Sequence, residues 1–177
     1  MDHEVIFEVK RVDELDNRQR SEIIDLCTIA YDEDFADWFD VLPGSTHVLA
    51  RLGGKLVSHA AWVTRWLQPQ GHAELRTAYV EAVATAPAYQ RRGFGKAVMA
   101  ELRSQIGQYD LGALSPSDPA FYEPLGWELW RGPLAIRSAN GLLETPNDRV
   151  MVMRLGRSRD IDVNRPMTAE WRHAELW

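Results

Sequence analysis

A seven-residue stretch in the middle of the chain has the residue types and the spacing of an anion-binding loop. It reads Gln90, Arg91, Arg92, Gly93, Phe94, Gly95 and Lys96. Its two glycines let backbone N–H groups approach a phosphate closely, and a helical run that begins at Phe94 presents its positive N-terminal end to the same place. The three basic side chains add formal charge. The stretch therefore predicts a cradle for a diphosphate, but a glycine-rich turn with two solvated arginines would have the same composition.

The elements on either side of this loop are those that would position it. The run Tyr79–Thr85 before the loop is typical of a strand, and Phe94–Ile106 after it repeats apolar residues at helical spacing. The inner side of that helix is predicted to consist of Val98, Leu102 and Ile106. A short buried strand is expected at Leu111–Leu114. Strand, loop, helix and strand make one βαβ unit within a mixed sheet.

The rest of the chain alternates between predicted strands and short helices. A helix is expected over Leu15–Ala30, with Ile23, Leu26 and Cys27 on one side, and Gly53-Gly54 is typical of the turn of a hairpin. Two further short helices are expected, over Asp34–Val41 and Pro119–Leu125. The remaining predicted strands are Val5–Arg11, His47–Leu52, Lys55–Trp66, Leu75–Thr85, Trp127–Ile136 and Arg149–Leu155.

Composition and charge limit the classes of protein to which the chain can belong. Its 177 residues suffice for one domain with a sizeable core, and a single cysteine excludes an internal disulfide. The net charge of −6, from 26 acidic and 20 basic residues, argues against a nucleic-acid groove and suits a cationic partner. No apolar run reaches membrane-spanning length, and no apolar leader follows Met1, so we expect a cytoplasmic protein with no membrane partner.

No metal centre is expected. The histidines are His3, His47, His59, His72 and His173. They are scattered without ligand spacing, and we interpret each as structural or solvated. Cys27 lies on the apolar side of a predicted helix, where it is expected to pack as a small hydrophobe and not to act as a nucleophile.

The segments that flank the loop resemble the acetyl-CoA-binding core of the GNAT superfamily of N-acetyltransferases. The resemblance rests on Tyr79–Thr85, on Phe121–Trp127 and on the loop itself, which fits the pyrophosphate signature of that superfamily at every position. It implies the GNAT fold, an α/β (α+β) protein with a mixed central sheet, in which acetyl-CoA binds at the loop between the fourth strand and the third helix. The implied cofactor-binding residues are Val83, Thr85, Gln90, Arg91, Arg92, Gly93, Phe94, Gly95 and Lys96. Backbone N–H groups around Val83 and Thr85 would polarise the thioester carbonyl and pair with the pantetheine arm.

A more specific resemblance is to the aminoglycoside 2'-N-acetyltransferases, and it extends over most of the chain. It rests on Tyr79-Val80-Glu81, Leu111–Ser115, Gly126-Trp127 with Gly132-Pro133, Thr145–Asp148 and the ending Trp171–Trp177. The family usually has an acidic residue where this chain has Asn147. The resemblance implies one domain over residues 1–177, with 156–177 a C-terminal substrate-binding tail, and it implies a homodimer.

The resemblance also assigns catalytic roles to two residues. Glu81 is implied as the general base, acting through water on the amine, because an ammonium is not nucleophilic. Tyr122 is implied as the acid that protonates the CoA sulfur as it leaves, since a phenol is a neutral proton donor at pH 7. From the residues alone, Glu81 could also be a carboxylate on a solvent-facing strand position, and Tyr122 a packed ring with its hydroxyl bonded to backbone.

The implied acceptor is a polycation, an aminoglycoside, held by carboxylates. The residues that match the acceptor-binding positions of the family are Asp34, Asp37, Glu81, Ser115, Asp148, Glu175 and Trp177 with its terminal carboxylate. A single surface carboxylate is usually only a solvated charge, whereas several that converge would concentrate and orient a polycation. Two alternatives stay open: a GNAT enzyme for another small amine or a peptide N-terminus, and a CoA-binding homologue without transfer activity.

Overall fold

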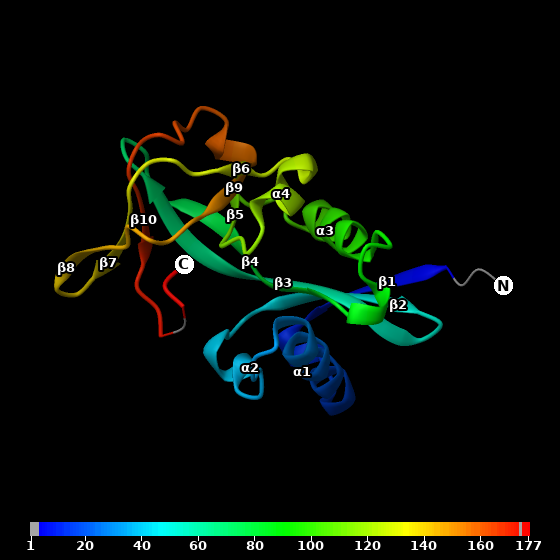
Figure 1. Ribbon diagram of the computed structural model, residues 1–177. Coiled ribbons are helices and arrows are strands. Elements are labelled where there is room, and N and C mark those ends of the chain that lie inside the picture. The colour runs from blue at the N-terminus through cyan, green and yellow to red at the C-terminus, as the bar shows by residue number, and fades with distance from the viewer. Residues whose placement is uncertain (1–3, 174) are drawn as a thin grey trace. The chain divides into compact units, whose positions relative to one another are not determined.

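The computed structural model describes residues 4–173 and 175–177 (Figure 1). The described residues do not include Met1, Asp2, His3 and Ala174. The prediction that His3 is structural or solvated therefore lies outside the described residues. The chain divides into two compact units, Met1–Val63 with Val80–Gln105, and Thr64–Tyr79 with Ile106–Trp177. Two long strands, β3 (Lys55–Pro69) and β4 (Leu75–Thr85), contribute residues to both units.

The first unit is built on the antiparallel strands β1 (Val5–Arg11), β2 (Thr46–Leu52) and the first part of β3. The β2–β3 hairpin closes on Gly53 and Gly54, whose φ angles of +57° and +80° are those of a two-residue turn with two left-handed positions, as the sequence predicted. Helix α1 (Asn17–Tyr31) and the short α2 (Trp38–Val41) lie against one face of these strands and α3 (Phe94–Gln105) against the other (Figure 1).

Local sequence explains where α1 begins and which side it buries. Asp16 caps the helix by accepting from the N–H of Gln19, and the Gln19 side chain accepts from the N–H of Asp16 in return. Ile23, Leu26 and Cys27 are buried, as their spacing predicted. They pack in one core cluster with Leu15, Leu49, Leu56 and Ala84. On α3, the predicted inward residues Val98 and Leu102 are fully buried, and Ile106, just after the helix, is buried as well.

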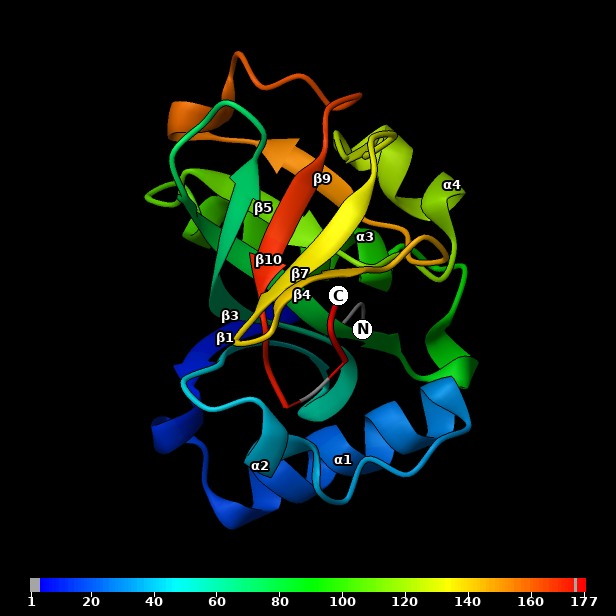
Figure 2. The ribbon, with the colours of Figure 1, turned by 90° about the vertical axis from the view of Figure 1, so that its left-hand side faces the viewer.

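The second unit contains both antiparallel and parallel strand pairs. Its strand order is β6-β9-β5-β4-β3-β10-β7-β8. The bounds are β5 (Leu111–Leu114), β6 (Glu128–Leu129), β7 (Leu134–Ser138), β8 (Gly141–Glu144), β9 (Met151–Arg154) and β10 (Met167–Glu170). Strand β10 pairs antiparallel with β3 and parallel with β7 (Figure 2), so the sheet is mixed, as predicted. The expected helix Pro119–Leu125 is present as α4 (Pro119–Tyr122) followed by one 3₁₀ turn.

Four parts of the secondary structure differ from the sequence-based expectation, and the first is the helix expected over Asp34–Val41, which is present only as α2 at Trp38–Val41. The run Trp127–Ile136 is two strands instead of one, because Gly132 and Pro133 interrupt it where Gly132 donates its N–H to the Val163 carbonyl. A Cβ at Gly132 would lie 1.9 Å from the Arg165 carbonyl oxygen, so only glycine allows this close approach. Strands β8 and β10 were not predicted. Residues 156–177, expected as a tail, thus include a strand within the sheet.

Candidate active site

The loop predicted to hold a diphosphate is an exposed turn that leads directly into α3. Arg91 and Gly93 both have left-handed backbone, with φ of +59° and +90°, and the first hydrogen bond of the helix runs from the Ala97 N–H to the Gly93 carbonyl at 2.9 Å. The backbone N–H groups of the first turn of the helix therefore lie outside the intrahelical ladder. A Cβ built on Gly93 would meet nothing within 4 Å, so the protein leaves open space beside this backbone. These are the geometric requirements of an anion cradle.

Cationic and aromatic side chains surround the loop. The Arg92 guanidinium lies over the rings of Tyr89, at 5.3 Å, and Phe94, at 5.5 Å. The Lys55 ammonium also lies over the Tyr89 ring, at 5.5 Å from its centroid. Lys55 was not predicted as a site residue, because it lies far before the loop in the sequence and has no motif of its own. Gln90 fastens the loop to β4 by donating its side-chain N–H to the Thr85 carbonyl at 3.2 Å.

The part of β4 that carries Glu81 is not a regular strand. Ala82, the next residue, has φ of +49°, a conformation that a residue with a Cβ rarely adopts. Three carbonyls in a row accept hydrogen bonds at 2.9 Å from side chains in the same unit: Ala82 from His59, Val83 from Tyr31, and Ala84 from Ser58. Glu81 itself is partly buried. Side chains therefore fix the backbone on which Glu81, Val83 and Thr85 are placed.

Tyr122 lies in the second unit, at the end of α4. Asp118 caps this helix by accepting from the Ala120 N–H at 3.1 Å, and Pro119 occupies its first turn. The Tyr122 ring is buried and packs edge-on against Phe121 and Trp127. Burial, with the negative charge of Asp118, raises the pKa of Tyr122 to about 12. The phenol therefore keeps its proton at neutral pH, which is the state that a general acid needs.

The predicted acceptor-binding carboxylates are exposed in both units. Asp34 and Asp37 lie in the turn before α2, where Asp34 accepts from the Ala36 N–H at 2.9 Å. In the second unit, Ser115, Asp148 and Glu175 are also exposed. The predicted base Glu81 belongs to the first unit and the predicted acid Tyr122 to the second.

Trp177 is anchored within the second unit and does not present its indole to solvent. The residue is 3% exposed, and its indole N–H donates to the Thr145 hydroxyl at 2.8 Å. Arg65, itself 1% exposed, donates to the carbonyls of Leu176 and Glu170, both at 2.8 Å, and lies over the rings of Tyr79 and Trp177. The indole of Trp177 therefore anchors this residue within the second unit.

Sequence reasoning missed Arg65. It lies in a strand pattern that alternates around it and has no partner nearby in sequence, whereas the carbonyls that it binds follow 105 and 111 positions later. Burial and the neighbouring charge of Arg172 lower the pKa of Arg65, and Glu170 acts in the opposite direction. A buried guanidinium without this many acceptors would be strongly destabilising. Arg65 can therefore stay buried only where the C-terminal segment supplies the carbonyls of Glu170 and Leu176.

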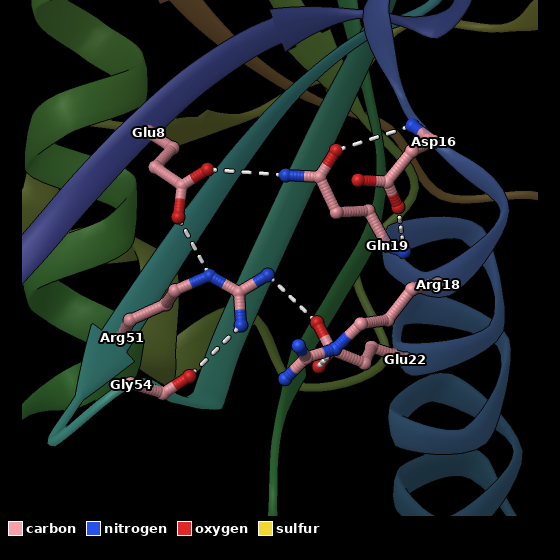
Figure 3. Close-up of a pocket in the computed structure, with 7 residues that line it drawn as sticks. All are labelled: Glu8, Asp16, Arg18, Gln19, Glu22, Arg51 and Gly54. Carbon is pink, nitrogen blue, oxygen red and sulfur yellow. Dashed lines mark hydrogen bonds and ion pairs between the residues drawn. The ribbon is translucent and has the colours of Figure 1, made fainter.

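A pocket of about 250 Å³ in the first unit is lined by Glu8, Asp16, Arg18, Gln19, Glu22, Arg51 and Gly54 (Figure 3). None of these residues was predicted as a site residue. The Arg51 guanidinium donates hydrogen bonds to the Glu8 carboxylate at 2.6 Å, to the Glu22 carboxylate at 2.7 Å and to the Gly54 carbonyl at 3.1 Å. Although burial opposes it, the hydrogen bond and charge of Arg51 lower the pKa of Glu22. The network satisfies its own charges and joins β1, α1 and the β2–β3 turn.

Neither a metal-binding cluster nor a membrane-spanning helix is present among the residues that the structure describes. Among residues 4–173 and 175–177, no group of three or more histidine, cysteine, aspartate or glutamate side chains is arranged to hold a metal ion. Within the same residues, no helix has the length and apolar character that crossing a membrane requires.

Comparison with known proteins decides the family. Residues 11–130 match the Acetyltransferase (GNAT) domain family. The chain belongs to the GNAT acetyltransferases. This acetyltransferase is also 35% identical over 173 residues to a protein of Mycolicibacterium fortuitum named aminoglycoside 2'-N-acetyltransferase, with 93% of this chain and 88% of the relative covered.

Solved structures confirm the fold of this acetyltransferase. The GNAT family N-acetyltransferase YhbS from Escherichia coli, crystallised in complex with CoA, matches with a TM-score of 0.67 at 16% identity, over 96% of this chain and 91% of that one. ElaA from Escherichia coli matches with a TM-score of 0.62 at 13% identity, over 85% and 100% of the two chains. Eis1 from Mycobacterium abscessus has a TM-score of 0.61 at 17% identity over 73% of this chain, which spans about a third (33%) of that protein. The predicted GNAT fold is therefore correct.

Proposed function

We propose that this acetyltransferase transfers the acetyl group of acetyl-CoA to the 2'-amine of an aminoglycoside, and that it thereby acts as an antibiotic-resistance enzyme. The observation that carries the proposal is the 35% identity, over 93% of the chain, to a protein with that name.

Acetyl-CoA is proposed to bind with its pyrophosphate on the loop from Gln90 to Lys96. The left-handed backbone at Gly93, the open space beside it and the first turn of α3 support this placement. Arg91 and Lys96 are exposed and available to a phosphate, whereas Arg92 is partly engaged with aromatic rings. Bound acetyl-CoA supplies the acetyl thioester. The backbone N–H groups around Val83 and Thr85 are proposed to polarise its carbonyl.

The proposed chemistry is direct transfer without an acetylated enzyme. Glu81, through a water molecule, takes the proton that the 2'-ammonium must lose before its nitrogen can attack. The amine nitrogen forms the new C–N bond to the acetyl carbon while the C–S bond breaks, and Tyr122 gives its proton to the departing sulfur. The second proton that the nitrogen loses as it becomes the amide returns to the Tyr122 phenolate through solvent. The pKa of Tyr122, raised to about 12 by burial, supports this role because the residue enters each cycle protonated.

Acceptor binding is proposed to depend on charge. Aminoglycosides are polycations, and the exposed carboxylates Asp34, Asp37, Asp148 and Glu175, with that of Trp177, would bind them by charge-assisted hydrogen bonds, helped by the Ser115 hydroxyl. The net charge of −6 would attract such a substrate over a longer range.

The experiment measures acceptor-dependent release of CoA thiol over a panel of amines. Tobramycin and gentamicin, which carry a 2'-amine, should be acetylated, whereas kanamycin A, with a 2'-hydroxyl, should be a poor acceptor. NMR of the product identifies the acetylated nitrogen. Acetylation at a 3- or 6'-amine would refute the assignment. Turnover only with peptides or other small amines would favour the first alternative, and CoA binding without turnover the second.

The setting of the reaction belongs to the same proposal. We place the enzyme in the cytoplasm, where acetyl-CoA is available, as a single functional domain that ends in a substrate-binding tail. We also propose a homodimer, on the resemblance alone. Sedimentation equilibrium over a range of concentrations tests the dimer.

A further inference from the structure

A chain of buried polar groups leads from the loop before β2 to the irregular part of β4. The Ser45 hydroxyl lies 2.9 Å from His47 Nε2, His47 Nδ1 lies 3.0 Å from His59 Nε2, and His59 Nδ1 lies 2.9 Å from the Ala82 carbonyl oxygen. Both imidazoles are fully buried and Ser45 is 1% exposed. We call Ser45, His47 and His59 the histidine relay. All of its members, and Ala82, belong to the first unit.

The Ala82 carbonyl oxygen, at one end of the relay, determines which nitrogen of each histidine carries a hydrogen. A carbonyl oxygen can only accept, so His59 must carry its proton on Nδ1. In a neutral imidazole Nε2 of His59 then has a lone pair, so His47 must donate from its own Nδ1. By the same step Nε2 of His47 accepts from the Ser45 hydroxyl. Each of the three hydrogen bonds has one donor and one acceptor only in this arrangement.

The surroundings of the two rings favour the neutral form. Trp38 packs edge-on against both imidazoles and Phe39 lies against His47. Two further groups act on the rings: Arg20, whose charge disfavours a proton on His47, and the Cys27 thiol, 4.0 Å from His59 Nδ1. Burial first of all lowers the pKa of His47 to about 3 and that of His59 to about 4.

The relay ends at the residue that makes β4 irregular. Ala82, with φ of +49°, stands between Glu81 and Val83. Side chains of a regular strand alternate between its two faces, so one residue that leaves the extended conformation resets the direction of its neighbours. The conformation of Ala82 thereby sets where the Glu81 carboxylate and the Val83 N–H point. Such a conformation persists only when the surroundings enforce it, and His59 is bonded to its carbonyl.

We propose that His59, oriented by His47 and Ser45, is a positioning residue for acetyl transfer, because it holds the Ala82 carbonyl and thereby the direction of Glu81 and of the Val83 N–H. This inference rests on the role proposed for Glu81. It gives the two buried histidines a task beyond the structural one that the sequence indicated.

The first test replaces His59 by leucine, of similar volume but without a donor, and by asparagine, whose side-chain N–H can take the place of Nδ1–H. His59→Leu should lower kcat by about 10- to 100-fold, the loss typical of a displaced reacting group, and His59→Asn should recover most of it. Leu102→Ala, fully buried on α3 and outside the core cluster of Ile23, Cys27 and Ala84, is the matched control for lost stability. It should lower the melting temperature while the folded enzyme keeps its kcat.

The second test does not depend on turnover. Nitrogen chemical shifts of the two buried rings should show protonated Nδ1 and unprotonated Nε2 on both. In His59→Leu the backbone amide signals of residues 81–84 should move, whereas Leu102→Ala, outside the core cluster that contains Ala84, should leave them in place. If His59→Leu does not fold, Ser45→Ala, which removes only the last donor, should shift the same signals and lower kcat by a smaller factor.

The outcomes separate a failure of the positioning role of His59 from a failure of the proposed function. Protonated Nε2 on either ring, or wild-type kcat in folded His59→Leu, would overturn the positioning role. Correct tautomers and shifted amides in an enzyme that acetylates no aminoglycoside would preserve the relay and remove the proposed function.

Discussion

Acidification from pH 7 to pH 5 should destabilise this enzyme, because two histidines are buried in the neutral state. The ordinary pKa of each is 6.5, whereas burial lowers that of His47 to about 3 and that of His59 to about 4. Between these values the unfolded chain binds a proton on each ring and the folded chain does not. The contribution of the two neutral rings to the free energy of unfolding is therefore complete above pH 6.5 and is lost as the pH drops toward 4.

The size of the loss follows from the same values. For one ring that stays neutral when folded, the change from pH 7 to pH 5 costs about 2 kcal/mol, and for the pair about 4 kcal/mol, a large part of the stability of an ordinary domain. The carboxyl groups with lowered pKa, Glu22 and Asp162, have ordinary values of 4.5 and 3.8, so their contribution is lost mainly below this window.

Urea unfolding at half-unit steps between pH 7 and pH 5, followed by circular dichroism, measures the effect. His59→Asn removes one of the two titrating rings and should lose about half of the pH dependence, which isolates the relay from all other groups. A free energy of unfolding that changes by less than about 1 kcal/mol over this range would show that the rings are protonated or solvated in the folded state, and would refute the reasoning.

Three further predictions concern the proposed site. Gly93→Val should weaken CoA binding by about tenfold or more in calorimetric titration, since φ of +90° excludes a β-branched residue, and an unchanged affinity would remove the diphosphate from this loop. Tyr122→Phe should lower kcat by about 10²- to 10⁴-fold with little change in CoA affinity. Glu81→Gln should lower the rate most below neutral pH, where more of the acceptor is protonated. The pH–rate profiles of both variants check this, and a wild-type profile would exclude the residue concerned from the mechanism. Arg65→Met should raise the aminoglycoside KM by about tenfold at constant CoA affinity, as should deletion of Glu175–Trp177, because charge-assisted hydrogen bonds hold that end of the chain; an equal KM would make the anchor irrelevant to the acceptor.

Local sequence signals predicted most of the fold because the elements concerned are stabilised locally. The Gly53-Gly54 turn and the helical spacing of Ile23, Leu26 and Cys27 can be read from a few neighbouring residues, and both were correct. Strand β8 was not predicted because all four of its residues are exposed and show no alternation. Strand β10 was missed because it pairs with partners about a hundred and about thirty residues earlier, which no local pattern records.

The candidate site divides in the same way. The loop up to Lys96 is contiguous, so its residue types could be recognised together. The support of β4 is not contiguous: His47 and His59 are twelve residues apart, and His59 reaches a carbonyl 23 positions later. Only the folded chain shows that these residues meet. The roles of Glu81 and Tyr122 stay predictions.

The fixed direction of the histidine relay also constrains how related sequences can change. Replacing one member by a side chain without a matching donor or acceptor leaves a buried ring nitrogen facing a group with which it cannot bond. A single substitution at these positions is therefore tolerated only where the new side chain supplies the same donor or acceptor, as asparagine does at His59. Among relatives that keep alanine after the glutamate of β4, Ser45, His47 and His59 should be retained or exchanged as a set, and a relative that lost only one of them should carry glycine at the position of Ala82, where left-handed backbone needs no support.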